Sequence, residues 1–227
     1  MKFDRLENLI GSFSLGRLIN STVLIVGLGG VGGYVVEALT RSGVGNLILV
    51  DYDKVDITNF NRQIIATTSN VGKYKVDCFK ERIANINEKC NVKTYNLKLS
   101  LDNIEDVFET KIDFVVDAVD DVNAKKGIID YCLENNINFI SSMGTGNRLD
   151  PSKLIITSLD KTYNDPLAKI MRKKFDKTMQ KKIKVCTSVE LPVKVKNKNT
   201  IGSNAFVPSS AGLLIASYIV KKISETK

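Results

Sequence analysis

The sequence predicts an α/β protein with a doubly wound, Rossmann-like and mostly parallel sheet, helices on both faces and a C-terminal extension. Short apolar runs, the clearest of them at residues 23–26 and 113–119, alternate with segments whose apolar residues repeat at helical spacing. Such alternation is typical of parallel sheets, because each crossover helix covers one face of the sheet. A turn rich in glycine follows the first run and joins it to a helix, which is the usual opening of this fold.

The expected elements follow one another through residues 1–145. We expect a helical lead-in at 1–20, strands at 23–26, 92–97, 113–119 and 138–144, a strand ending at residue 51, and helices from about 31 and at 74–86, 101–108 and 123–135. In residues 146–227 we expect a strand at 154–162, a basic helix at 165–182, a strand at 184–195 interrupted by Pro192, and an apolar helix at 209–223. One domain with a specialised C-terminal part is the simplest organisation.

The composition excludes several classes of protein. Of the 227 residues, 43% are hydrophobic and 26% are charged, as in an ordinary globular protein. No apolar run is long enough for a signal peptide or a membrane span, which takes about 20 residues. The four cysteines contain no CxxC pair, so a disulfide framework or a structural zinc site is not expected. We therefore expect a cytoplasmic protein.

The positive charge is concentrated in one segment. Residues 165–198 hold 11 Lys or Arg and 3 Asp or Glu, which accounts for the whole net charge of +8. Such a surface is suited to a polyanion, although a solvated face rich in lysine has the same composition. The candidate contacts are Arg172, Lys173, Lys174, Lys181 and Lys182.

The glycine-rich turn predicts a nucleotide site. A turn of this kind lets backbone N–H groups approach a phosphate, and the next helix directs its positive end at the same place. Asp51 stands 19 residues after the last glycine of the turn and is placed to bind a ribose, which fits NAD and keeps an NAD-dependent oxidoreductase as an alternative. The glycines of the turn are Gly27, Gly29, Gly30 and Gly32.

The polar loop after Asp51 favours a triphosphate over a dinucleotide. Asp53, Asn59 and Arg62 lie in DYDKVDITNFNRQ, beyond the carboxyl end of a predicted strand, where ligands of doubly wound sheets bind. Lys75 opens the next helix and can supply a cation, although a solvated lysine would fit the same position. Asp120 follows another strand end and can hold magnesium with phosphates, although Asp120 or Asp121 could instead cap a helix.

Residues 1 to about 145 closely resemble the adenylating enzymes of the ubiquitin-activating type. The resemblance rests on GLGGVG, on DYDKVDITNFNRQ, on VGKYK and on the strand end at Asp120. It implies that ATP is bound, with the ribose on Asp51, the phosphates on Asn59, Arg62 and Lys75, and magnesium on Asp120. It also implies a homodimer in which Arg5 reaches the ATP of the partner.

The C-terminal part resembles the tRNA threonylcarbamoyladenosine dehydratases. The matching stretches are GTGNRLDPSKLIITSLDKTYNDPLAKIMRKKF, KVCTSVELP and GSNAFVPSSAGLLIASYIVKKI. This resemblance implies cyclisation of a threonylcarbamoyl group on tRNA through an acyl-adenylate, with Arg5, Arg62, Lys75 and Asp120 as catalytic residues. The sequence leaves a sulfur-transfer partner protein open. Adenylation of the C-terminus of a small protein remains an alternative function. For Cys186 the sequence favours packing in the core.

Overall fold

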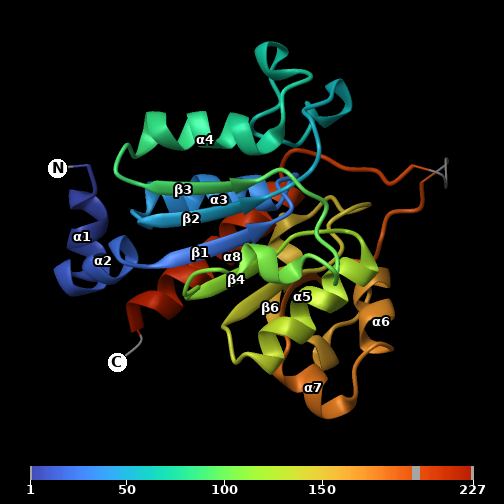
Figure 1. Ribbon diagram of the computed structural model, residues 1–227. Helices are drawn as coiled ribbons and strands as arrows, with labels where there is room; N and C mark the ends of the chain where they lie inside the picture. The colour runs from blue at the N-terminus through green and yellow to red at the C-terminus, as the bar shows by residue number, and fades with distance from the viewer. Residues whose placement is uncertain (1, 196–199, 226–227) are drawn as a thin grey trace.

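The computed structural model describes residues 2–195 and 200–225, and its centre is a sheet of seven strands in the order β3-β2-β1-β4-β5-β7-β6 (Figure 1). Neighbouring strands are parallel except for the edge pair β6 and β7. The strands are β1 Thr22–Val26, β2 Asn46–Val50, β3 Asn91–Tyr95, β4 Phe114–Asp117, β5 Phe139–Ser142, β6 Leu154–Ser158 and β7 Lys184–Ser188. The predicted doubly wound α/β fold is confirmed.

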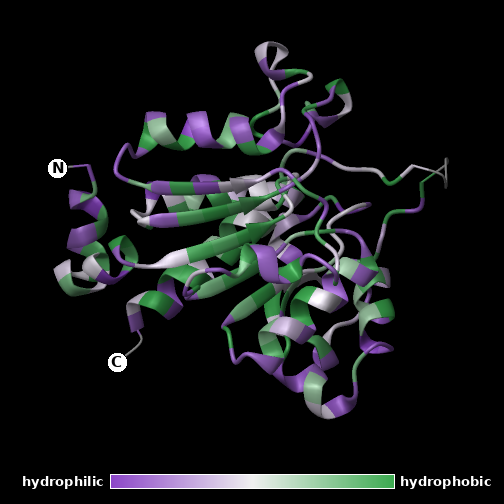
Figure 2. Ribbon diagram, in the orientation of Figure 1, coloured by the Kyte–Doolittle hydropathy of each residue, from purple (hydrophilic) through white to green (hydrophobic). Residues whose placement is uncertain are grey.

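The central strands are apolar throughout because both of their faces are covered. Ile25 on β1 packs into one hydrophobic cluster, whereas the preceding Leu24 packs into the cluster on the other side of the sheet. On the edge strand β3 the side chains of Asn91 and Lys93 are exposed, and the strand is largely hydrophilic in Figure 2. Its position at the edge explains this difference, since an edge strand meets solvent.

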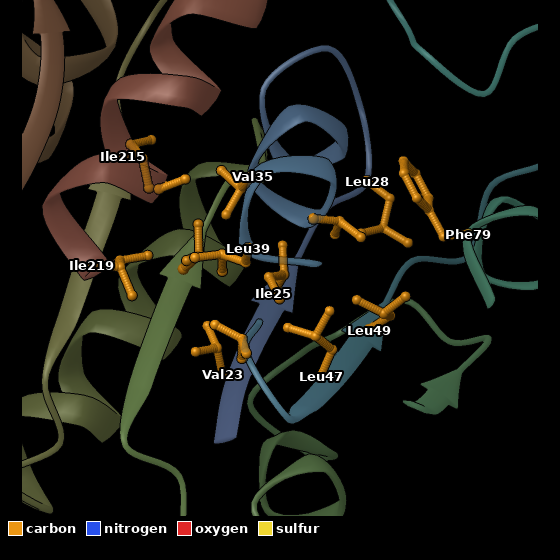
Figure 3. Close-up of a cluster of buried hydrophobic side chains, with 14 of the residues drawn as sticks. Val23, Ile25, Leu28, Val35, Leu39, Leu47, Leu49, Phe79, Ile215 and Ile219 are labelled. Carbon is orange, nitrogen blue, oxygen red and sulfur yellow. The ribbon is translucent and has the colours of Figure 1, made fainter. Parts of the chain in front are cut away.

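One face of the sheet is covered by α3 Gly32–Arg41, α4 Lys75–Ile86 and α8 Val207–Glu225. Leu39 of α3 lies between the strands and Ile215 and Ile219 of α8, as Figure 3 shows. The other face is covered by α5 Val122–Glu134, α6 Pro166–Arg172 and α7 Lys177–Lys182. Residues after 145 thus add two strands to the same sheet, α6 and α7 to one face and α8 to the other.

The N-terminal helices α1 Asp4–Ile10 and α2 Ser12–Ile19 lie at the end of the sheet where the strands begin (Figure 1). Gly43 and Gly45, in the turn before β2, pack against Leu15 and Ile19 of α2. Lys2 is paired with Glu88 in the turn before β3. The amino ends of the strands are therefore covered by the lead-in, and their carboxyl ends lie on the opposite side of the molecule.

The C-terminal part corrects three expected boundaries. The single basic helix expected at 165–182 is wrong, because the side chain of Asp176 accepts hydrogen bonds from the N–H groups of Thr178 and Met179 and starts α7 as a separate helix. The strand expected at 184–195 ends at Ser188, before Pro192. The last helix is longer than expected at both ends, since α8 covers Val207–Glu225.

A buried ion pair joins the carboxyl ends of β4 and β5. The ammonium group of Lys125 on α5 is 2.8 Å from Oδ2 of Asp117, 3.2 Å from Oγ of Ser141 and 2.9 Å from the carbonyl oxygen of Ser142. Both charged side chains are completely buried. All three protons of the ammonium group have acceptors, so the desolvated charge is fully compensated and the turn after β4 is held in place.

We expect Lys125→Met to lower the free energy of unfolding by about 3–5 kcal/mol, because it leaves the Asp117 carboxylate buried without its partner. The neighbouring Lys126→Met is the matched control: Lys126 pairs with Asp130 at the surface, and such pairs on a helix contribute only about 0.3–0.5 kcal/mol. Urea unfolding followed by circular dichroism measures both variants. Equal losses in the two variants would contradict the interpretation.

Candidate functional site

The glycine turn brings the carboxyl ends of three strands together. Gly27 has a positive φ of 89°, and a Cβ there would lie 2.7 Å from the carbonyl oxygen of Ala118, beyond the end of β4. A Cβ on Gly32 would lie 1.8 Å from the carbonyl oxygen of Gly27. These two positions therefore require glycine, and the turn can fold tightly against the segment between β4 and α5.

Asp51 braces this turn from the end of β2. Its Oδ2 accepts a hydrogen bond of 2.6 Å from the N–H of Leu28, and its Oδ1 accepts one of 2.8 Å from the N–H of Asp53. Burial raises the pKa of the Asp51 carboxyl, while the charge of Lys75 and the two N–H donors act in the opposite direction. Asp51 thus lies beside the turn, where the sequence places a ribose-binding carboxylate, and it also has a structural role.

Lys75 is a buried cation beside Asp51 and Asp53 at the glycine turn, and not a solvated helix lysine. It is the first residue of α4, and only 4% of its surface is exposed. Its Nζ lies 2.7 Å from Oδ2 of Asp53 and 4.0 Å from Oδ1 of Asp51. The structure therefore brings together the glycine turn, both aspartates and Lys75, as the sequence predicts.

Arg62 lies against the glycine turn at Gly30. A Cβ on Gly30 would lie 3.3 Å from Cγ of Arg62. The guanidinium donates to the carbonyl oxygen of Thr58 and to Oδ1 of Asn61. Asn59 is buried one turn earlier, and its Oδ1 accepts from the N–H of Asp56 in a capping box, so its side chain already stabilises this 3-10 turn.

Gln63 is a residue for which the sequence analysis assigned no role. It is 7% exposed, and Oε1 of its amide has no hydrogen-bond partner among the described residues. Its Nε2 is the atom nearest to a Cβ on Gly29, at 3.9 Å. A buried polar atom without a partner is uncommon away from functional sites. Its place at the end of the DYDKVDITNFNRQ stretch is the signal that could have identified it.

Asp120 and Asp121 have different roles. Asp121 is the N-cap of α5, since its side chain accepts from the N–H groups of Asn123 and Ala124. Asp120 is exposed, lies two residues beyond Ala118 at the glycine turn, and has no hydrogen bond or ion pair with any described residue. The cap is thus Asp121, and the Asp120 carboxylate remains available to a ligand.

A single carboxylate is a sparse metal site. The described residues hold no group of three or more His, Cys, Asp or Glu side chains that could bind a metal by themselves. Asp120 fits magnesium only if phosphate oxygens complete the coordination, which is the usual arrangement for this ion with nucleotides.

The second half of the molecule contributes a buried charged network at the same end of the sheet, which sequence reasoning missed. Asp165 accepts hydrogen bonds from the N–H of Gly144 and from Oγ1 of Thr187. Arg148 is 2% exposed and donates to the carbonyl oxygens of Glu190 and Asn164. The segment before α8 is also tied to the Arg62 loop, because Nδ2 of Asn61 is 3.0 Å from the carbonyl oxygen of Ser203.

The structure does not bring every candidate to this crevice. Arg5 is exposed on α1, which lies at the amino ends of the strands (Figure 1). Arg172 donates to the carbonyl oxygen and the hydroxyl of Thr162 and so supports the fold locally. Lys173 and Lys174 are exposed after α6, whereas Lys181 and Lys182 end α7, directly before the amino end of β7.

The four thiols are unsuited to nucleophilic chemistry. Cys186 is 1% exposed and lies in the hydrophobic core, which confirms the packing role that the sequence favours. Burial raises the pKa of Cys90 to about 11 and those of Cys132 and Cys186 to about 12. Burial also raises the pKa of Cys78. None of them has the lowered pKa of a reactive cysteine.

The fold and the residues around the glycine turn define a doubly wound α/β protein with a buried lysine and an unpaired carboxylate at the carboxyl ends of its strands. The model of the ThiF family matches residues 3–227, and the chain belongs to that family. It is 42% identical to the tRNA threonylcarbamoyladenosine dehydratase of Bacillus subtilis over 236 residues, which cover 96% of this chain and 93% of the relative.

Solved structures give the same relationship. The Escherichia coli tRNA N6-threonylcarbamoyladenosine dehydratase, in crystals with ATP and with AMP, superposes with TM-scores of 0.92 and 0.93 at 32% identity. Each superposition covers 98% of this chain and 93% of the relative.

No helix among residues 2–195 and 200–225 is long and apolar enough to span a membrane.

We expect the four cysteines to resist alkylation, because burial raises the pKa of every one of the thiols. At a pKa of 11 to 12, the range of Cys90, Cys132 and Cys186, less than about 0.1% of a thiol is ionised at pH 7.5. Treatment with excess iodoacetamide at that pH, followed by peptide mass spectrometry, should leave Cys78, Cys132 and Cys186 unmodified and label the half-buried Cys90 only slowly. Rapid labelling of Cys186 in the folded protein would contradict the assignment.

Proposed function

We propose that this protein is an ATP-dependent enzyme that cyclises the threonylcarbamoyl group of threonylcarbamoyladenosine in tRNA, through an acyl-adenylate of the threonyl carboxylate. The observation that carries the proposal is the set of groups at the glycine turn: the buried Lys75, the adjacent Arg62 and the unpaired Asp120. Cations together with a free carboxylate suit a triphosphate with its metal ion better than a dinucleotide. Relatives of the whole chain that carry the dehydratase name support the choice of substrate.

The chain's own residues bind and orient ATP. The turn of Gly27, Gly29, Gly30 and Gly32 and the start of α3 offer N–H groups and a positive helix end to the phosphates. The Asp51 carboxylate, fixed by two N–H groups, accepts from the ribose hydroxyls through its remaining lone pairs. Asp53 holds Lys75 at 2.7 Å until a phosphate oxygen replaces it, and Asn59 fixes the turn that carries Arg62.

The first step activates a poor electrophile. A carboxylate oxygen of the substrate forms a bond to the α-phosphorus of ATP, the bond from that phosphorus to the bridging oxygen breaks, and pyrophosphate leaves. Arg62 and Lys75 stabilise the negative charge that develops on the phosphate oxygens, the electrostatic contribution that is often largest in catalysis. Magnesium, held by Asp120 and phosphate oxygens, would supply further charge neutralisation.

The second step closes the ring without a protein nucleophile. The carbamoyl group attacks the acyl carbon, loses a proton, and expels AMP, so that one water is removed overall at the expense of ATP. Tethering makes this attack favourable, because a well-oriented intramolecular reaction gains about 7–11 kcal/mol over its bimolecular counterpart. The raised pKa values of the four thiols agree with a mechanism that uses no cysteine.

Two other functions make different use of the same fold. Adenylation of a small protein's C-terminus would share the first step but would not need the basic segment 165–198. NAD-dependent oxidoreduction would not need Arg62 or Asp120 at the phosphates.

We also propose a homodimer in which Arg5 completes the site of the partner. Within its own subunit Arg5 is on α1, which lies at the amino ends of the strands, whereas the proposed ATP site lies at their carboxyl ends.

We expect the purified protein to convert threonylcarbamoyladenosine to its cyclic form in tRNA from cells that lack the protein, with one AMP released per nucleoside. Nucleoside mass spectrometry after digestion measures the product, and NAD in place of ATP is the control. Retention of the cyclic nucleoside in those cells, or release of AMP only with a small acceptor protein, would contradict the proposed substrate.

We expect Asp120→Asn to lower the rate of AMP formation by at least about 100-fold, which corresponds to about 2.7 kcal/mol in the transition state. The variant should fold normally, because the carboxylate has no partner in the described part of the chain. The adjacent Asp121→Asn is the matched control, since asparagine also caps helices well. AMP formation at several magnesium concentrations separates the two variants, and similar rates in both would remove Asp120 from the site.

A further inference from the structure

A groove at the amino ends of β4, β5 and β7 lies on the side of the molecule opposite the nucleotide crevice. Its volume is about 590 Å³, and it is lined by residues from α5, α7 and α8 and by the strands' first residues. Phe114 and Tyr218 form part of its floor, with their rings 6.1 Å apart in an edge-to-face arrangement. We refer to this feature as the amino-end groove.

The groove gathers positive charge from three separate elements. Lys182 ends α7, Lys184 begins β7, and Lys222 lies in the last turns of α8, all of them exposed and all lining the groove. The ammonium groups of Lys182 and Lys184 have no ion pair or hydrogen bond with any described residue. Among the lining residues that the structure describes, Glu134 is the one acidic residue, so the groove has a net positive charge that suits an anion.

Neutral groups of the lining add hydrogen-bonding and stacking capacity. The side-chain amides of Asn136 and Asn138 have no partner in the described residues and can donate and accept. The ring of Tyr218 is partly exposed beside the ammonium group of Lys222, which lies 5.8 Å from the ring centroid. Lysines for phosphates, amides for base edges and 2′-hydroxyls, and an aromatic ring for a base are the groups with which proteins contact RNA.

A track of exposed lysines connects the groove with the nucleotide crevice. Asp165, at the start of α6, contacts Gly144 at the carboxyl end of β5, and Lys184 begins β7 at the amino end. The chain between these two points therefore runs along the sheet from one end to the other. It carries six exposed lysines, which are Lys169, Lys173, Lys174, Lys177, Lys181 and Lys182.

We propose that the amino-end groove binds the sugar-phosphate backbone of the tRNA substrate at a distance from the modified nucleoside. This proposal rests on the proposed function, which places the reacting nucleoside at the carboxyl ends of the strands. A strand of five residues is about 17 Å long, so the two ends are at least about five nucleotides of one RNA strand apart. A tRNA spans that distance, whereas a small anionic ligand in the crevice does not reach the groove.

The experiment compares two double variants of the full chain that remove the same charge. Lys182→Gln with Lys184→Gln changes the groove, and Lys80→Gln with Lys89→Gln changes exposed lysines on the α4 side. Binding of fluorescent tRNA is measured by anisotropy at several potassium chloride concentrations, and ATP binding and melting temperature are measured as checks of folding.

For the groove variant we expect at least a tenfold weaker tRNA affinity and a slope of log K against log salt that is shallower by about 1.4–1.8, as for the loss of two phosphate contacts. The control should change affinity less than twofold. At saturating tRNA the groove variant should cyclise at the wild-type rate, so that KM rises and kcat does not. Adding Lys222→Gln should weaken binding further.

Three outcomes would overturn the assignment of the groove. One is equal behaviour of the groove and control variants. Another is weaker binding of inorganic phosphate to the groove variant without any change in its tRNA affinity, which would indicate a site for a small anion. The third is dissociation of a dimer in the groove variant, seen by sedimentation, which would indicate an interface between copies. If instead the wild-type protein cyclises no tRNA at all, the proposed function itself fails.

Discussion

The close approach of backbone to backbone at the glycine turn is the constraint on which the site depends. Gly27 and Gly32 leave no room for a Cβ, and this lets the segment after β4 lie against the end of β1. Asp51 can then hold the N–H of Leu28 while it lies 4.0 Å from Lys75. A side chain at either glycine would separate these groups, because the obstructing atoms belong to rigid backbone. The position of the charges is thus a consequence of backbone packing.

Charged side chains that support the site have hydrogen-bond or ion-pair partners within the protein, whereas a charged side chain without such a partner is available to a ligand. Lys125 and Asp117 are fully buried, and every donor of the ammonium group has an acceptor. Such a pair contributes little net stability but fixes one arrangement, since breaking it leaves a desolvated charge. Asp120 is only three residues beyond Asp117 and has no partner among the described residues. The rigid pair therefore holds the backbone that carries the free carboxylate.

The sequence predicts the parallel sheet and most of the crevice, because both follow from local patterns. Strands buried on both faces are apolar throughout, and residues placed just after them meet at one edge, as Asp51 and Asp120 do. The break between α6 and α7 depends on Asp176 acting as the N-cap of α7. The sequence pattern fits a solvated residue within one continuous helix equally well. Gln63 and Arg148 are recognised only by their burial, which no local pattern specifies. The separation of Arg5 and Lys182 from the crevice requires the topology, since sequence distance does not indicate the end of the sheet.

The helix α8 links the two ends of the molecule. Near its start, Pro208 lies beside the glycine turn, where a Cβ on Gly30 would be 3.1 Å from the Cβ of Pro208. Near its end, Tyr218 and Lys222 line the amino-end groove. A helix of 19 residues is about 28 Å long and is fixed here by packing against α3 and the sheet. The distance between the glycine turn and Lys222 is therefore set by one rigid element. A substrate that contacts both must match that distance, which favours a large structured RNA over a free nucleoside.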